Sequence, residues 1–191
     1  MINNYVSDKV IVIDDFLKEP FLLRDFALKQ DYLQHDYHPG KRSKSFVNDE
    51  IEKNIQCFLP ARYGKILRFN NNFNCAFQIN LYNEESWVHS DRYHNFAGVL
   101  FLTPDAPPNS GTSFYRFYDG TVSSINDENN LEKVMFYSKD KTKWEVISSV
   151  ENKFNRLVLF DSRQYHQSTG YFGDNIDNGR LVQLFFFTTQ F

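Results

Sequence analysis

The sequence predicts an α+β protein in which N-terminal helices precede an all-β sandwich or barrel. Apolar residues recur at helical spacing only before about residue 60, and short apolar runs separated by turn residues follow. Aromatic residues make up 17% of the 191 residues, with 20 Phe and 11 Tyr, and residues of this kind favour strands. Helices that come first and strands that come later are typical of an α+β domain with a separate β core.

The first 64 residues are predicted to contain one strand and two helices. Residues 10–13 form a β-branched apolar run that is typical of a buried strand. A helix is expected over residues 19–33, because Pro20 suits a first helical turn and apolar residues follow at helical spacing. A polar loop over residues 35–48 and a second helix from Asp49 to Leu59, before Pro60, complete this part.

Residues 65–191 are predicted to form the β core of what the length indicates is one domain over residues 1–191. Within residues 76–82, Ile79 and Leu81 lie on one face and Gln78, Asn80 and Tyr82 on the other, as a barrel with a polar pocket would require. Residues 119–143 are charged and are interpreted as an insertion, and residues 167–179 as a loop. The further strands are expected at residues 96–102, 112–118, 144–147, 156–160 and 181–188.

Composition excludes several function classes. A net charge of −3 gives no sign of nucleic-acid binding. Cys57 and Cys75 are too few for a disulfide framework and lack the spacing of a zinc site, so we expect reduced thiols in a cytoplasmic protein. No apolar stretch approaches the ~20 residues that span a bilayer, and the N-terminus does not resemble a signal peptide, so no membrane partner is expected. The oligomeric state is left open.

His89, Asp91 and His166 are the candidate metal ligands. Residues at positions i and i+2 project from the same side of a strand, and His166 would come from another strand. Two imidazoles and one carboxylate on one side of a metal leave the opposite positions open, which is typical of non-haem Fe(II) sites. The motif His-x-Asp is short, and a polar turn after residues 83–86 is the alternative interpretation.

Two competing groups of ligands are weaker. His94 would share a face with Asp91, three residues earlier, only on a helix, and the surrounding sequence does not favour one. His35 and His38 with Asp36 would form a small site in a loop.

Arg180 opens the apolar strand of residues 181–187, where a cation needs a partner. Arginine binds carboxylates in bidentate fashion, so a dicarboxylate co-substrate would satisfy it, whereas an arginine that extends to water is the alternative. Tyr82 and Asn80 are candidates for contacting the same carboxylate, and Gln78 for contacting it or orienting the ligands. Each of the three is also explained as a structural polar group.

The order of these segments resembles the 2-oxoglutarate/Fe(II)-dependent dioxygenases, most closely the prolyl-4-hydroxylase-like branch. The resemblance covers residues 76–188 and is carried by Gln78–Tyr82, His89-x-Asp91, Val99–Leu102, Ser110–Phe114, Leu157–Phe160, His166 and Gly179-Arg180. It implies a double-stranded β-helix, or jelly roll, with the N-terminal helices packed against it. It further implies that His89, Asp91 and His166 hold Fe(II), and that Arg180, with Tyr82 and Asn80, binds 2-oxoglutarate.

The activity that the resemblance implies is hydroxylation of an unactivated C–H bond, with a peptidyl or free amino-acid side chain as the expected target, dioxygen consumed and succinate and CO2 released. Asp91 argues against halogenation, because halide-inserting relatives leave the carboxylate position empty. Many prolyl hydroxylases carry Lys where Arg180 stands, so prolyl specificity does not follow. Residues 38–43 are similar to an Arg-containing substrate loop, so Arg42 and Gln78 are expected to contact the substrate, a small molecule or a peptide.

Two other function classes remain open. A non-catalytic jelly-roll module would bind metal without turning over 2-oxoglutarate, but it would not need the dicarboxylate anchor at Arg180. A zinc hydrolase would use the same three ligands with a bound water, but no general base is evident near them in the sequence. Residues 35–48 and 119–143 are the candidates for a lid over the substrate.

Overall fold

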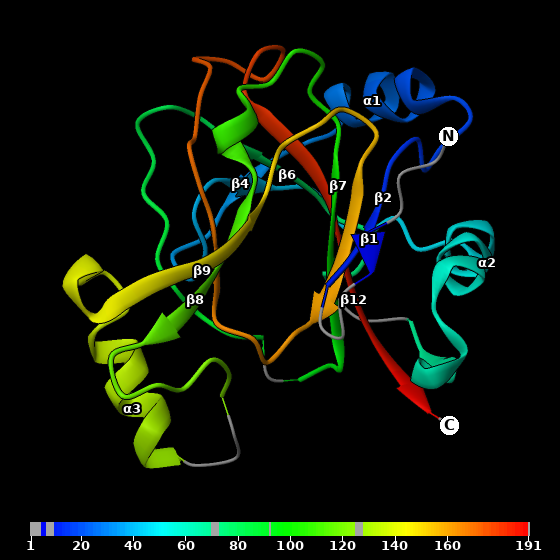
Figure 1. Cartoon of the computed structure of the whole chain (residues 1–191). Helices are drawn as coiled ribbons and strands as arrows, with labels where there is room; N and C mark the ends of the chain where they lie inside the picture. The colour runs from blue at the N-terminus through cyan, green and yellow to red at the C-terminus, as the bar shows by residue number, and fades with distance from the viewer. Residues whose placement is uncertain (1–4, 7–9, 70–72, 92, 125–127, 191) are drawn as a thin grey trace.

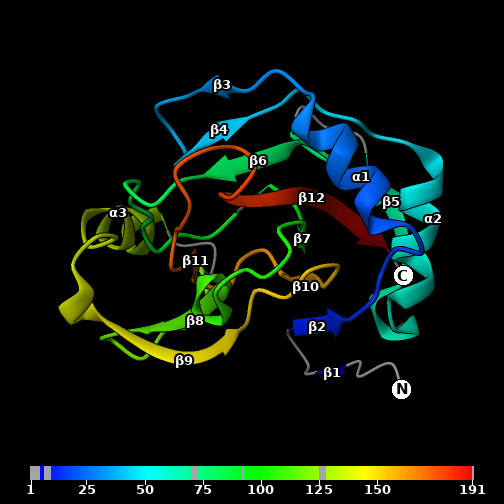
Figure 2. The same ribbon diagram turned by 90° about the horizontal axis from the view of Figure 1, so that it is seen from above.

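The computed structural model describes residues 5–6, 10–69, 73–91, 93–124 and 128–190. Two antiparallel β-sheets face each other, and helices α1 and α2 lie outside the larger one (Figures 1 and 2). The helices are α1 (Pro20–Leu28), α2 (Asp49–Phe58) and α3 (Glu128–Phe136), with short 3-10 turns at Ala61–Tyr63, Pro108–Ser110 and Lys141–Lys143. The strands are β1 (Tyr5–Val6), β2 (Val10–Ile13), β3 (Leu33–Gln34), β4 (Lys41–Arg42), β5 (Lys65–Arg68), β6 (Phe77–Asn80), β7 (Phe96–Phe101), β8 (Thr112–Phe117), β9 (Trp144–Val150), β10 (Leu157–Asp161), β11 (His166–Ser168) and β12 (Arg180–Gln190).

The larger sheet has the strand order β1-β2-β10-β7-β12-β6-β4-β3, with β5 paired to the far end of β12. The smaller sheet has the order β11-β8-β9. Strands that are far apart in the sequence are therefore neighbours, as in the pairing of β2 with β10 and of β12 with β6. The predicted α+β class with a jelly-roll core is confirmed, and four strands from the first 64 residues belong to the larger sheet.

Side chains alternate between the two faces of the larger sheet, because successive residues of a strand point to opposite sides. In β10, Leu157 and Leu159 pack in the cluster that includes the helices, whereas Val158 and Phe160 pack toward the smaller sheet. The ring of Phe160 meets that of Phe114, on β8, edge to face at 5.2 Å between centroids. The space between the sheets is thus a second apolar core.

The two N-terminal helices cover the outer face of the larger sheet. Ala27 of α1 and Ile55 of α2 are fully buried in the same cluster as Leu100 and Phe185. The α2 helix begins where Asn48 accepts a hydrogen bond from the Ile51 N–H at 2.9 Å, and it ends before Pro60, as predicted.

The first helix is shorter than predicted. It ends at Leu28, where the Lys29 N–H donates to the Phe26 carbonyl and the Tyr32 hydroxyl donates to the Ala27 carbonyl. Leu33, which the helical pattern included, instead lies in β3 and is 64% exposed. The prediction of helix over residues 29–33 is therefore wrong, because pairing with β4 replaces helical hydrogen bonds there.

The segment predicted as a polar loop over residues 35–48 contains strand β4. Arg42 pairs with Gln78 and Lys41 with Ile79 of β6. Gly40 makes this approach possible: its φ is +72°, and a Cβ there would lie 2.3 Å from the Ile79 carbonyl oxygen. The prediction of an unpaired loop is wrong at these positions.

Strand β6 ends at Asn80, two residues earlier than predicted. Tyr82 therefore lies outside the strand, where its N–H donates to the Gly173 carbonyl and its side chain is 68% exposed. The predicted insertion at residues 119–143 contains α3 within its described part. No helix in the described ranges is long and apolar enough to cross a membrane.

Asp14 joins the end of β2 to the turn before β10. Its carboxylate accepts hydrogen bonds from Arg156 Nε at 2.6 Å and Nη2 at 3.1 Å, and from Lys153 Nζ at 2.8 Å. The hydrogen bond with Arg156 lowers the pKa of this buried carboxyl against the opposing effect of burial. An ion pair of this kind is costly to break from one side, because the remaining charge is left partly buried.

We expect Asp14→Asn to lower the free energy of unfolding at pH 7 by about 2–4 kcal/mol. The pKa of Asp14 in the folded protein lies below 3.8. The contribution of its charge to the free energy of unfolding is therefore fully present above the unfolded-state pKa and is lost as the pH falls through the folded-state pKa. Urea unfolding at several pH values from 7 down to about 2 checks this. If the difference in free energy of unfolding between the wild type and Asp14→Asn stays constant below about pH 4, the expectation is contradicted.

Candidate metal centre

His89 and His166 are held side by side by their own backbones. The His89 N–H donates to the His166 carbonyl at 3.0 Å, and the His166 N–H donates to the His89 carbonyl at 2.9 Å. This reciprocal pair is a hydrogen-bonded pair of an antiparallel ladder, in which the two side chains lie on the same face, and the two imidazole centroids are 4.4 Å apart. His166 is the first residue of β11, so two distant parts of the sequence meet here.

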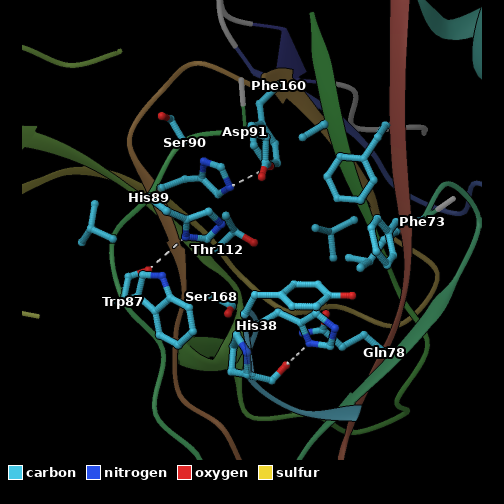
Figure 3. A pocket seen from close by; sticks show the side chains of 18 of the residues that line it. His38, Phe73, Gln78, Trp87, His89, Ser90, Asp91, Thr112, Phe160 and Ser168 are labelled. Atoms are coloured by element: carbon cyan, nitrogen blue, oxygen red, sulfur yellow. Dashed lines mark hydrogen bonds and ion pairs between the residues drawn. The ribbon is translucent and has the colours of Figure 1, made fainter. Parts of the chain in front are cut away.

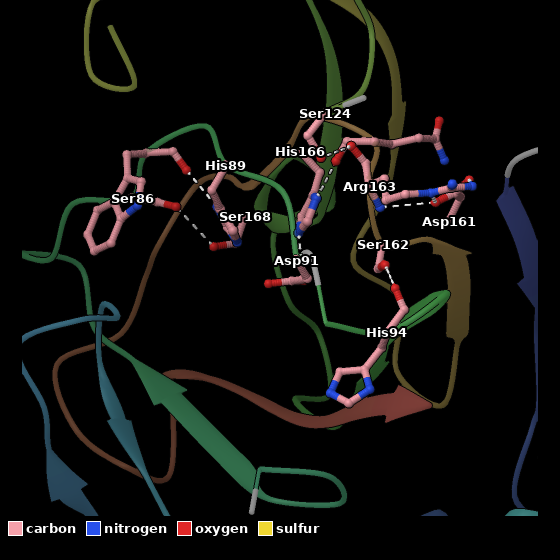
Figure 4. A network of polar contacts seen from close by, with 12 residues as sticks. Ser86, His89, Asp91, His94, Ser124, Asp161, Ser162, Arg163, His166 and Ser168 are labelled. Carbon is pink, nitrogen blue, oxygen red and sulfur yellow. Dashed lines mark hydrogen bonds and ion pairs between the residues drawn. The ribbon is translucent and has the colours of Figure 1, made fainter. Parts of the chain in front are cut away.

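Asp91 completes the group, as the spacing of two residues predicts. Its N–H donates to the Ser162 carbonyl at 2.7 Å, and its Oδ2 lies 3.4 Å from His166 Nε2. One ligand atom from each of His89, Asp91 and His166 falls within 4.8 Å of the others. Figure 4 shows His166 directed at Asp91, with His94 set apart from both.

The competing ligand groups do not assemble. Among the residues that the structure describes, His89, Asp91 and His166 are the only set of three His, Cys, Asp or Glu side chains that converges in this way. Neither His94 nor the group of His35, Asp36 and His38 joins such a set.

Both imidazoles present the same nitrogen to the centre. His89 Nδ1 donates to the Trp87 carbonyl at 3.0 Å (Figure 3), and His166 Nδ1 donates to the Gln164 carbonyl at 2.8 Å. Because a carbonyl oxygen only accepts, Nδ1 carries the proton in the neutral rings and Nε2 carries the free lone pair. The two ligands are thus oriented by the chain itself.

The protonation states also suit a metal. Burial, followed by the neighbouring His166, lowers the pKa of His89 to about 4, so this ring is neutral at pH 7. Burial would raise the pKa of Asp91, but the neighbouring His166, His89 and Arg42 together outweigh it and leave the pKa below its usual value. The group therefore offers the neutral imidazole of His89, an ionised carboxylate and the imidazole of His166.

A cavity of about 520 Å³ opens beside this group, between the two sheets (Figure 3). This volume lies in the range of small-molecule sites, about 300–1,000 Å³. Both segments considered as lids contribute to its wall, His38 and Arg42 from the first and Val134 and Met135 from the second.

Arg180 lines the cavity and is 2% exposed. Its Nε donates to the Ser110 carbonyl at 2.8 Å and its Nη2 to the Gly111 carbonyl at 3.1 Å, and its guanidinium lies over the rings of Phe101 and Tyr171. Burial lowers its pKa to about 10, which leaves it charged at neutral pH. In the described part of the chain no carboxylate pairs with it, and it does not extend to water as the alternative interpretation required.

Thr112 is a pocket residue that the sequence analysis did not single out. It is 2% exposed, and its Oγ1 has no hydrogen-bond partner among the described residues. It follows Gly111, whose carbonyl binds Arg180, so both residues lie at the same end of the cavity. The small polar run Ser110-Gly111-Thr112 before an aromatic strand was the available signal.

The other predicted site residues divide into two groups. Arg42 and Gln78 line the cavity, and Arg42 Nε donates to Gln78 Oε1 at 2.6 Å. Asn80 is fully buried beside them but does not line the cavity, and Tyr82 lies outside it. The tyrosine found next to Arg180 is Tyr171 rather than Tyr82.

Residues 4–187 match the model of a family described as a family of unknown function (DUF6445). The chain belongs to the DUF6445 family. No curated protein matches it.

Solved structures resemble this DUF6445 protein over nearly its whole length. HygX from Streptomyces hygroscopicus, solved with nickel, 2-oxoglutarate and hygromycin B bound, has a TM-score of 0.62 at 13% identity, covering 96% of this chain and 84% of HygX. The non-haem α-ketoglutarate-dependent epimerase SnoN from nogalamycin biosynthesis has a TM-score of 0.61 at 12% identity, with 95% and 79% covered. A prolyl hydroxylase from Trichoplax adhaerens, in complex with a hypoxia-inducible-factor peptide, has a TM-score of 0.56 at 13% identity, with 95% and 84% covered.

The fold of this DUF6445 protein is therefore the double-stranded β-helix of the 2-oxoglutarate/Fe(II)-dependent dioxygenases, as the resemblance in the sequence predicted. The similar structures include a prolyl hydroxylase, a protein with hygromycin B bound and an epimerase from nogalamycin biosynthesis, so likeness of fold does not point to one substrate.

We expect the protein to bind one divalent metal ion per chain. His89→Ala and Asp91→Ala should each weaken the metal affinity at least about a hundredfold, because removing a ligand costs more affinity than removing a group that only hydrogen-bonds a ligand. Calorimetric titration of the metal-free protein with Zn²⁺ measures this. His94→Ala is the matched control, because His94 lines the same cavity but lies outside the group. A loss of affinity in the control equal to that in the ligand variants would contradict the assignment.

Proposed function

We propose that this protein is an Fe(II)- and 2-oxoglutarate-dependent dioxygenase that hydroxylates an unactivated C–H bond of a small molecule or peptidyl side chain. The observation that carries the proposal is the convergence of His89, Asp91 and His166 at a cavity that also contains Arg180, a buried cation with no carboxylate partner among the described residues. A metal site alone, or a buried arginine alone, would have simpler explanations.

The three ligands fit Fe(II). Two neutral imidazole nitrogens and one carboxylate on one side of a metal are the donor set of non-haem iron oxygenases, with open positions opposite. When bound, the metal would supply the oxidative decarboxylation of 2-oxoglutarate by dioxygen to succinate and CO2, with the second oxygen atom inserted into the substrate C–H bond.

Arg180 and Thr112 fit the distal carboxylate of 2-oxoglutarate. The Arg180 guanidinium keeps N–H groups beyond those bound to the Ser110 and Gly111 carbonyls, and the Thr112 hydroxyl has no partner among the described residues. A dicarboxylate with one end at the metal and the other at Arg180 would provide the anion that this buried cation lacks. Nickel and 2-oxoglutarate are bound together in the structure of HygX, which has the same fold.

The walls of the cavity would keep water from the reacting groups. Val99, Phe160 and Leu184 line it, and they belong to the apolar core between the two sheets. A dry site strengthens the attraction between Arg180 and a carboxylate and limits side reactions.

The zinc hydrolase interpretation finds no second carboxylate to act as a base in the described part of the cavity. Among the described residues that line the cavity, Asp91 is the only carboxylate, and it belongs to the ligand group. A hydrolase with three protein ligands would need a further group to take a proton from the bound water.

Anaerobic addition of Fe(II) and 2-oxoglutarate is expected to give a visible charge-transfer band, and subsequent air to give succinate. Asp91→Ala should lose both, because it removes the carboxylate ligand. Metal binding without band or succinate in the wild-type protein would overturn the proposal and leave a non-catalytic binding module.

Arg180→Lys should raise the Kd for 2-oxoglutarate by about ten- to a hundredfold, since Lys keeps the charge but not the paired donors. The band, titrated with 2-oxoglutarate at saturating Fe(II), measures the change. Arg163→Gln, which removes a surface arginine paired with Asp161, is the matched control and should leave the titration unchanged. An unchanged Kd in Arg180→Lys would remove Arg180 from the proposed binding site.

A further inference from the structure

Arg42 is a second cation in the cavity, and no carboxylate of the described residues forms an ion pair with it. It lies on β4 opposite Gln78 and lines the cavity. Its guanidinium carbon is 5.7 Å from the Phe73 ring centroid, and the rings of Tyr37 and His38 belong to the same cluster. No ion pair joins it to a carboxylate among the described residues, and burial lowers its pKa to about 10, so it stays charged at neutral pH.

A chain of amide groups fixes the orientation of Arg42. Arg42 Nε donates to Gln78 Oε1 at 2.6 Å, Gln78 Nε2 donates to Asn80 Oδ1 at 2.8 Å, and Asn80 Nδ2 donates to Glu84 Oε2 at 2.9 Å. Because an arginine only donates and an ionised carboxylate only accepts, the two ends determine the direction of every bond between them. The Nε edge of Arg42 is thereby occupied, and its two Nη groups have no partner within the described residues.

The charges of the proposed holoenzyme leave Arg42 unmatched. Asp91 and the metal-bound end of 2-oxoglutarate together match a divalent ion, and the distal carboxylate matches Arg180. The remaining neighbour, His38, adds no negative charge, and burial lowers its pKa to about 4, so it is neutral. A cation held in a largely buried position without an anion is unfavourable, and one further negative charge would relieve this.

From these contacts we infer that the substrate is a free monocarboxylic acid, whose carboxylate binds the Nη groups of Arg42 and whose body is apolar. This inference rests on the proposed function, because the metal and 2-oxoglutarate take up the other charges. The planar carboxylate suits the paired donors of a guanidinium, and the rings of Phe73 and Tyr37 suit an apolar body. An uncharged side chain within a peptide would leave Arg42 unpaired.

The test compares 3-phenylpropanoate with 3-phenylpropanamide, which has nearly the same shape without the charge. Both are titrated by calorimetry into Zn²⁺-loaded protein, which does not turn over, with 2-oxoglutarate kept saturating so that the acid does not replace it. The acid is expected to bind at least about ten times more tightly than the amide, as a charge-assisted pair of hydrogen bonds implies. Arg42→Gln should abolish this preference, and Arg42→Lys should retain part of it.

Lys41→Gln is the matched control, because it removes a positive charge from the neighbouring position of β4 that does not line the cavity, and it should keep the preference. Equal binding of the two probes by the wild type, binding of neither, or a preference that survives in Arg42→Gln would overturn the inference. The Fe(II)–2-oxoglutarate band is recorded for the wild type and Arg42→Gln. A band without a preference for the acid overturns this inference alone, whereas absence of the band from the wild type overturns the proposed function.

Discussion

The central strands of the larger sheet are buried on both faces, and the rest of the structure depends on this constraint. Strand alternation sends Phe77 and Ile79 of β6 into the core beneath the helices and sends Gln78 and Asn80 to the opposite face. Register then places Arg180 of β12 beside Asn80, and Arg42 of β4 beside Gln78. Three neighbouring strands thus form one row of polar side chains, and the row lies at the edge of an otherwise apolar space between the sheets. The cavity therefore lies where polar side chains replace apolar ones on the face of the larger sheet that is turned toward the smaller sheet.

The metal centre is organised by main-chain groups before any metal is considered. The reciprocal backbone bonds between His89 and His166 fix the distance between the rings, and carbonyls two residues earlier in each segment fix which nitrogen is protonated. Asp91 follows from the extended conformation after His89. A site that is oriented in this way loses little conformational freedom when an ion binds.

Features set by local spacing could be predicted from the sequence, whereas those set by distant contacts could not. His89, Asp91 and the two faces of β6 follow from a period of two residues, and Arg180 was recognisable as a cation at the start of an apolar strand. Tyr82 was misplaced because the end of β6 depends on a bond to Gly173 in a remote loop. Strand β4 has only two residues, too few for any periodicity, and it depends on the backbone of Gly40. Thr112 belongs to a small polar run before an aromatic strand, but only the fold places its hydroxyl at the cavity without a partner among the described residues.

The position of β12 has a consequence for how the protein reaches its native state. Strands β6 and β7 follow each other in the sequence but are not paired, because β12 lies between them. All three metal ligands precede β12 in the sequence. The sheet that supports their cavity, however, lacks a central strand until β12 pairs with β6 and β7. Such non-local pairing requires long loops to close before contacts stabilise them, which slows folding relative to helical proteins of similar size. The cavity beside the metal centre is therefore completed only when the whole sheet has paired.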